Sequence, residues 1–298
     1  MTALTALETF TETSHKAANE VIGSYSTSFG LATRLLGARH RQHIRNVYAL
    51  VRVADEIVDG VAQQAGLSLA EQRASLARFR DETERAIACG YSADVIIHAF
   101  AGTARLSGFG EELTGPFFDA MAMDLESPKD DAQPIAKFGA ERHDTYVFGS
   151  AEVVGLMCLR VFAREETLTN AEIRALDRGA CQLGAAFQDI NFLRDLHDDL
   201  ERGRSYLGDD GALTGEAKDA WVAKVRAQLD DAERAIPLLP KDARAAVRCA
   251  HSIFANLIDR IDDAPIAHLH EGRLRVPDPV KTWLAIKAVA TTAMERRA

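Results

Sequence analysis

The sequence has few features of disulfide-rich, nucleic-acid-binding or membrane-spanning proteins. A zinc site or a disulfide framework usually shows cysteines in closely spaced pairs. The four cysteines of this chain are instead scattered, at Cys89, Cys158, Cys181 and Cys249. The formal net charge of −9 argues against nucleic-acid binding, because such proteins present basic surfaces to phosphates. The chain lacks an uninterrupted apolar run of about 18 residues, and its N-terminus does not resemble a signal peptide. We expect a cytoplasmic protein. If it contacts a membrane, the contact would be peripheral.

Strand patterns and early prolines are also scarce. All eight prolines lie from Pro116 onward, and sustained alternation of polar and apolar residues is hard to find. Apolar residues instead recur at helical spacing, and at 47% hydrophobic the chain can build one large core. We predict a single all-α domain over residues 1–298, with its core over about 20–285 and a large central cavity. Helices are expected at about 14–36, 41–60, 69–89, 93–106, 112–126, 138–165, 170–202, 215–235, 240–263 and 279–296.

One predicted helix carries a polar stripe in apolar surroundings. In the segment 188–199, QDINFLRDLHDD, the stripe lies within a range of about 80° around the helix axis. Its members are Gln188, Asn191, Asp195 and Asp199. Carboxylates on one helix face repel each other unless a cation joins them. Mg²⁺ binds oxygen ligands, usually one or two carboxylates together with substrate phosphates. The stripe therefore predicts half of a metal–diphosphate site.

A second stripe of this kind precedes the first by more than a hundred residues. It follows Tyr48 and consists of Arg52, Asp55 and Asp59, again in an otherwise apolar helix. A single Asp-x-x-x-Asp spacing is common on solvated helices, but two in apolar helices are hard to explain as ordinary surface charge. We expect the two helices to face each other across the cavity. Several Mg²⁺ ions, with Mn²⁺ as the alternative, would hold a diphosphate between them.

Other polar residues have both a structural and a functional explanation. Ser26 and Ser28 belong to a hydroxyl-rich segment that either begins a helix or contacts phosphate. Asp124 ends an apolar run and is equally a surface residue at a helix end. Glu152 lies in an apolar helix, where a carboxylate is costly to bury without a partner. It would face either a neighbouring helix or the cavity.

The two stripes resemble the squalene/phytoene synthase family, and in particular its bacterial phytoene synthases. The matching motifs are Tyr48-x-x-x-Arg52-x-x-Asp55-x-x-x-Asp59, Gln188-x-x-Asn191-x-x-Arg194-Asp195-x-x-x-Asp199 and Arg204-Ser205-Tyr206-Leu207. Chain-elongating prenyltransferases use Asp-Asp-x-x-Asp motifs instead. The resemblance extends over most of the chain, from Ser24 to Lys281.

The resemblance implies an isoprenoid synthase fold and a Mg²⁺-dependent prenyltransferase. By this analogy the metal ligands are Asp55, Asp59, Asn191, Asp195 and Asp199. The four aspartates, Tyr48 and Arg52 would be the catalytic residues. Contacts to the prenyl diphosphate substrates are expected from Ser26, Ser28, Tyr146, Gln188, Asn191, Arg194, Arg204, Tyr206 and Arg273.

The implied reaction is the head-to-head condensation of two geranylgeranyl diphosphates to phytoene, a carotenoid precursor, through a cyclopropyl diphosphate. The chain has no glycine-rich nucleotide loop and no membrane anchor after Ala298, so we expect no nicotinamide cofactor and no reductive squalene formation. A synthase using farnesyl diphosphate and a cyclase of one prenyl diphosphate are alternatives, and a non-catalytic binder is the least favoured. Glu152 and Phe254 depart from the family's usual glycine and tyrosine, which leaves the product open. The sequence does not determine the oligomeric state.

Overall fold

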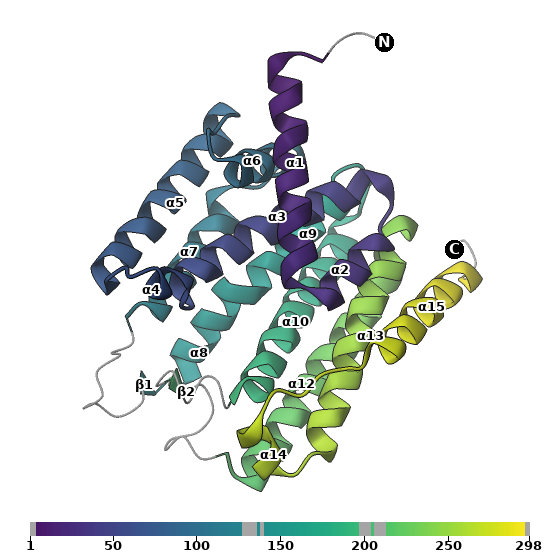
Figure 1. The fold of residues 1–298 in the computed structure, drawn as a ribbon. Coiled ribbons are helices and arrows are strands. Elements are labelled where there is room, and N and C mark those ends of the chain that lie inside the picture. Colours follow the sequence, from purple (N-terminus) through teal and green to yellow (C-terminus); the bar gives the residue numbers. More distant parts are fainter. Residues whose placement is uncertain (1–3, 127–135, 138–139, 197–203, 206–212, 296–298) are drawn as a thin grey trace.

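The computed structural model describes residues 4–126, 136–137, 140–196, 204–205 and 213–295. These residues form a bundle of helices, in which α3, α9 and α10 lie in the middle and α5 and α15 at opposite outer edges (Figure 1). Within the described ranges, extended structure is limited to a parallel pair of two-residue strands, β1 (Ala136–Lys137) and β2 (Arg204–Ser205). The prediction of an all-α fold is confirmed.

The helices follow the expected order along the chain. The first seven are α1 (Ala6–Tyr25), α2 (Thr27–Arg34), α3 (Ala38–Val58), α4 (Val61–Gln64), α5 (Leu69–Cys89), α6 (Val95–Ser107) and α7 (Glu111–Asp124). The central ones are α8 (Ala140–Val147), the π-helical turn η1 (Phe148–Glu152), α9 (Val153–Ala163) and α10 (Asn170–Arg194). The last are α12 (Gly215–Ala235), the 3₁₀ turn η2 (Ile236–Leu238), α13 (Lys241–Asp263), α14 (Ile266–Glu271) and α15 (Asp278–Met294). The bounds of α5 and α12 agree with the predicted ones.

The predicted helix over 14–36 is wrong at its start and in its middle. The chain becomes helical at Ala6, because Thr5 and Glu8 form a capping box. It is then divided at Ser26, whose backbone is extended. The Ser26 hydroxyl accepts a hydrogen bond of 3.0 Å from the N–H of Phe29 and so caps α2. The interpretation of this hydroxyl-rich segment as a helix start is therefore confirmed for α2.

The helices in the middle of the bundle approach each other backbone to backbone. A Cβ atom added to Gly155 of α9 would lie 2.5 Å from the carbonyl oxygen of Ala180 on α10. One added to Gly184 of α10 would lie 2.5 Å from the carbonyl oxygen of Ala151 in η1.

The helical stretch Glu141–Ala163 is long and apolar enough to cross a membrane, but half of its most apolar 18-residue window is buried inside the protein. It is therefore explained by its place in the core.

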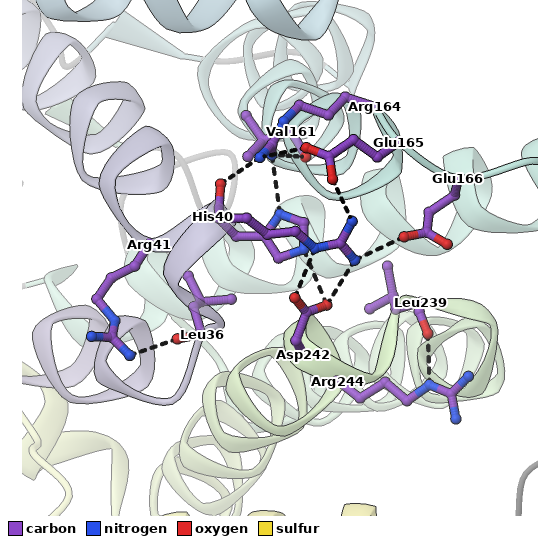
Figure 2. Close-up of polar contacts among 11 residues, drawn as sticks. Leu36, His40, Arg41, Val161, Arg164, Glu165, Glu166, Leu239, Asp242 and Arg244 are labelled. Carbon is purple, nitrogen blue, oxygen red and sulfur yellow. Dashed lines mark hydrogen bonds and ion pairs between the residues drawn. The ribbon is translucent and has the colours of Figure 1, made fainter.

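A polar junction ties α3 to α13 and to the end of α9 (Figure 2). The Arg39 guanidinium contacts Asp242 at 2.8 Å, and it also reaches Glu165 at 2.9 Å and Glu166 at 2.8 Å. Hydrogen bonds from Arg39 lower the pKa of Asp242 to about 2. The same aspartate lies 3.2 Å from Nε2 of the fully buried His40. The junction fixes the start of α3 relative to the start of α13.

Candidate active site

A cavity of about 1050 Å³ runs along α3. Its wall includes Leu36, two residues before this helix, and Asp59, the residue after it, so the cavity extends along all 21 residues of α3. A helix of that length extends about 31 Å. Carboxylates and arginines line the cavity where α3 and α10 end, whereas Leu36 and Leu239 line it beside the polar junction (Figure 2). The cavity thus has a polar end and a long apolar part.

Most of the predicted site residues lie on this cavity. Those that line it are Ser26, Ser28, Tyr48, Arg52, Asp55, Asp59, Tyr146, Gln188, Asn191, Arg194, Asp195 and Arg273. Asp199 and Tyr206 lie outside the described residues, as does the side chain of Arg204. The cavity brings together residues from α2, α3, α8, α10 and the segment before α15.

The first aspartate pair lies at the C-terminal end of α3. Asp55 belongs to the last turn of the helix, whereas Asp59 is the residue that follows it, with φ −99°, and not a helical residue as its spacing predicted. The Asp59 N–H still donates a hydrogen bond of 2.7 Å to the Asp55 carbonyl oxygen, and Gly60 then turns the chain with φ +119°. Loss of hydration raises the pKa of Asp55 well above its usual range, and the charges of Asp59 and Asp124 raise it further. This arrangement favours a bound cation.

The second motif repeats this geometry at the end of α10. Asp195 follows the last residue of α10, with φ −100°, so the predicted helix over 170–202 is interrupted there, and its predicted end lies outside the described residues. The Asp195 N–H donates a hydrogen bond of 2.8 Å to the Asn191 carbonyl oxygen. Both Asp59 and Asp195 therefore lie at the negative end of a helix dipole, where a carboxylate is disfavoured and a cation is favoured.

Asp195 lies between two arginines. Arg194 contacts both of its carboxylate oxygens, at 2.7 and 2.6 Å. Arg273 contacts the same two oxygens, at 2.7 and 3.0 Å. Because guanidinium groups also form paired hydrogen bonds with phosphate oxygens, these arginines are suited to binding a diphosphate next to the carboxylate.

A carboxylate that the sequence left ambiguous, Asp124, belongs to this cavity. It ends α7, is only 3% exposed and accepts a hydrogen bond of 2.9 Å from the Tyr146 hydroxyl. The alternative of a surface residue at a helix end is therefore wrong. Its position at the end of a strongly apolar run was the only signal in the sequence. Lys281 also lines the cavity and lies 2.9 Å from the Thr27 hydroxyl.

The wall near α2 combines hydroxyl, phenol and guanidinium groups. Burial raises the pKa of Tyr48, whose phenol is hydrogen-bonded with Ser26. The Arg52 guanidinium lies 4.4 Å from the centre of the Tyr25 ring and pairs with Glu56 on the next turn of α3. The Tyr48 phenol and the Arg52 guanidinium are therefore held by neighbours before any ligand binds. This reduces the entropy lost when they are oriented toward the ligand.

The two residues that depart from the family pattern, Glu152 and Phe254, lie in different surroundings. Glu152 does not line the cavity: its side chain is hydrogen-bonded with Cys181 of α10, and burial raises its pKa. Phe254 does line the cavity, and its ring stacks on that of Phe187 with 3.8 Å between the centroids. Phe254 can therefore touch the apolar part of a ligand, and Glu152 is partnered by a neighbouring helix.

The donor set fits Mg²⁺ only together with a ligand that brings its own oxygens. Within the described part of the chain, no three Asp, Glu, His or Cys side chains converge on one point. Mg²⁺ sites commonly combine one or two carboxylates with substrate phosphates, so a preformed cage is not required. Oδ1 of Asn191 is buried and lacks a hydrogen-bond partner among the described residues, which agrees with a role as a ligand.

Comparison with known proteins identifies the family of this chain. The sequence model of the squalene/phytoene synthase family matches residues 22–279. The 15-cis-phytoene synthase of Synechocystis sp. is 29% identical over 295 residues, covering 91% of this chain and 82% of that protein. The phytoene synthase of Pseudescherichia vulneris is 30% identical over 266 residues, covering 80% of each chain. Among solved structures, a dehydrosqualene synthase in complex with ligand shares the fold, with a TM-score of 0.75 at 20% identity, over 96% of this chain and 98% of that one.

Proposed function

This chain belongs to the squalene/phytoene synthase family and is a prenyltransferase, and we propose that it joins two molecules of geranylgeranyl diphosphate head to head to form phytoene. The proposed route passes through a cyclopropyl diphosphate. The observation that carries the proposal is the shape of the cavity, in which a polar end with carboxylates and arginines continues into an apolar channel along α3. Such a channel suits a substrate with a diphosphate head and a long hydrocarbon tail. The choice of a C20 substrate rests on the similarity to phytoene synthases.

The polar end supplies groups for the diphosphate. We assign the metal to Asp55, Asp59, Asn191, Asp195 and Asp199. When bound, Mg²⁺ would neutralise the diphosphate and make it a better leaving group. Phosphate oxygens would accept hydrogen bonds from Arg52, Arg194, Arg204, Arg273, Gln188, Ser26 and Ser28. We assign substrate contacts to Tyr48, Tyr146 and Tyr206.

The apolar part would shelter the allylic carbocation left by the departing diphosphate. Val154 and Leu183 present only hydrocarbon to the cavity, which excludes water from the reacting carbons. The stacked rings of Phe187 and Phe254 present aromatic surface, which attracts positive charge. Together these side chains would protect the cation until the new carbon–carbon bond forms.

Product analysis tests the proposal. The purified protein is incubated with Mg²⁺ and either geranylgeranyl or farnesyl diphosphate, and the extracted hydrocarbons are identified by mass spectrometry. We expect a C40 product from geranylgeranyl diphosphate, with Mn²⁺ as a substitute ion and no product in EDTA. A C30 product from farnesyl diphosphate alone, or a cyclic C20 product, would overturn the assignment.

A further inference from the structure

Behind the cavity wall, a fully buried carboxylate joins three helices. Asp189 of α10 is 0% exposed and does not line the cavity, although its neighbour Gln188 does. Its Oδ1 atom lies 3.1 Å from Nε2 of His143 on α8, which is within ion-pair distance but outside the geometry of a hydrogen bond. Its Oδ2 atom lies 2.9 Å from Nζ of Lys224 and 2.9 Å from Nε2 of Gln228, both on α12. Burial alone would raise the pKa of Asp189, but these three partners hold it below its ordinary value.

His143 connects this carboxylate to the aromatic packing of α8. The imidazole ring lies between Phe192 of α10 and Trp221 of α12, with centroids 5.6 and 5.1 Å away. Its Nδ1 atom lies 3.3 Å from the exposed carboxylate of Asp144. The charged groups that face His143 are therefore Asp144 and Asp189, with Lys224 behind the latter. A buried aspartate and two rings fix the position of the imidazole.

Tyr146 follows His143 by three residues and shares its face of α8. Its ring packs against the same Phe192, with 6.0 Å between centroids, and its hydroxyl donates the hydrogen bond to Asp124 at the cavity. The helix continues from Tyr146 into the π-helical turn η1, in which the regular register is interrupted. Because of this turn, the rotation of α8 about its axis does not follow from the position of α9. Contacts of α8 with other helices must therefore fix which side chains it turns toward the cavity.

We propose that His143, held by Asp189, is a positioning residue that places the Tyr146 hydroxyl against Asp124 at the cavity. Lys224 and Gln228 keep the Asp189 carboxylate oriented toward α8. This inference rests on the proposed function, because its readout is prenyl transfer. A loss of His143 is expected to leave the diphosphate-binding arginines in place and to displace only the phenol.

A double-mutant cycle between His143 and Tyr146 tests the proposal. The variants His143→Phe, Tyr146→Phe and the double variant are assayed with Mg²⁺ and the diphosphate substrate, and kcat and KM are determined separately. We expect His143→Phe and Tyr146→Phe each to lower kcat/KM about 10- to 100-fold, because either change removes the substrate contact of a correctly placed Tyr146 phenol. In the Tyr146→Phe background, His143→Phe should have no further effect, because the hydroxyl that His143 positions is already gone.

Conservative and control variants separate positioning from folding. His143→Gln keeps a donor beside Asp189 and should retain most of the activity, whereas Asp189→Asn should resemble His143→Phe. Asp177→Asn is the matched control, since it weakens the Arg160–Asp177 pair of 2.7 Å, which joins α10 to α9 and has neither residue on the cavity wall. Circular dichroism melting verifies that each variant is folded.

The outcomes distinguish the two proposals. If the wild-type protein forms no prenyl product, the proposed function fails. If the wild type is active and the losses from His143→Phe and Tyr146→Phe multiply, His143 does not act through Tyr146 and the inference is overturned. The same holds if Asp177→Asn costs as much activity as Asp189→Asn.

Discussion

The Nε atom of Arg273 lies 2.7 Å from the carboxylate of Asp195, although the two residues are 78 positions apart in the sequence. Arg273 belongs to the segment between α14 and α15, and Asp195 follows the last residue of α10. The pair therefore joins the end of α10 to the segment before α15, at the polar end of the cavity. An arginine held there can bind a phosphate without first being ordered.

Removing this guanidinium should weaken substrate binding. We expect Arg273→Leu to raise KM for the prenyl diphosphate about 10- to 100-fold, because one or two charge-assisted hydrogen bonds are lost. Arg273→Lys should restore part of this loss, since it keeps the charge but not the paired donors. Arg226→Leu is the control: it removes a surface arginine paired with Asp259 and Asp262, away from the cavity. Equal KM values for both leucine variants would contradict the assignment.

The carboxylate of Asp55 should be required for activity but should not stabilise the metal-free protein. Asp55→Asn is expected to lower activity with Mg²⁺ by about 100-fold or more, because a ligand of the metal–diphosphate site is lost. In EDTA, its melting temperature should equal or exceed that of the wild type, because Asp55 is partly buried and is repelled by Asp59. Thermal melting with and without Mg²⁺ measures this.

The exposed Asp119 on α7 offers the matched aspartate. Asp119→Asn should alter stability by less than about 1 kcal/mol and leave activity unchanged, because it loses only a surface ion pair with Arg80. A metal-free Asp55→Asn protein that is clearly less stable than the wild type would show that Asp55 has a structural partner.

Two glycines should respond in opposite directions to the same change. Gly155→Ala should destabilise the protein by about 2 kcal/mol or more, because the new Cβ would lie 2.5 Å from the backbone oxygen of Ala180. Gly102→Ala should stabilise it by about 0.5–1 kcal/mol, because this glycine lies in the middle of α6 with no atom within 4 Å of its added Cβ. Urea unfolding gives both free energies. A similar loss for both variants would rule out backbone contact as the cause.

The polar junction of Figure 2 predicts a pH-dependent contribution to stability. Arg39 lowers the pKa of Asp242 to about 2, so the charged carboxylate stabilises the folded state. This contribution is present above the ordinary pKa of an aspartate, about 4, and is lost as the pH falls toward 2. Since Asp242 is 37% exposed, solvent screening leaves about 1 kcal/mol.

The measurement compares the wild type with Asp242→Asn in urea. The variant should be less stable at pH 7, and the difference should shrink as the pH is lowered from 4 to 3. A difference that stays constant over this range would mean that Asp242 acts through packing and not through its charge.

Helix positions were predictable where the signal is local. The bounds of α5 and α12 follow from apolar periodicity and nearby caps, such as Ser68 with Glu71 before α5. The break at Ser26 was missed because a helical pattern continues on both sides of it, and the competing hydrogen bond becomes visible only in the folded chain. The predicted helix over 41–60 continued two residues past Val58, the last residue of α3, because helical spacing alone does not mark the residue at which a helix ends.

Site residues were predictable where they repeat at helical spacing. Asp55 and Asn191 were found this way, since the period of a helix places such residues on one face whatever surrounds it. Asp124 was uncertain and the His143–Asp189 pair was missed, because their partners lie on other helices. The spacing of one helix carries no information about such pairs.

The sequence by itself determined that the chain is helical and that two of its helices carry polar stripes, because periodicity and capping are properties of neighbouring residues. Tertiary structure decided which groups meet. It turned Glu152 toward Cys181 and away from the cavity, and it placed Arg273 on Asp195 and Tyr146 on Asp124. These contacts depend on the close approach of helix backbones, such as that of Gly155 to Ala180, which is a property of the packed bundle as a whole.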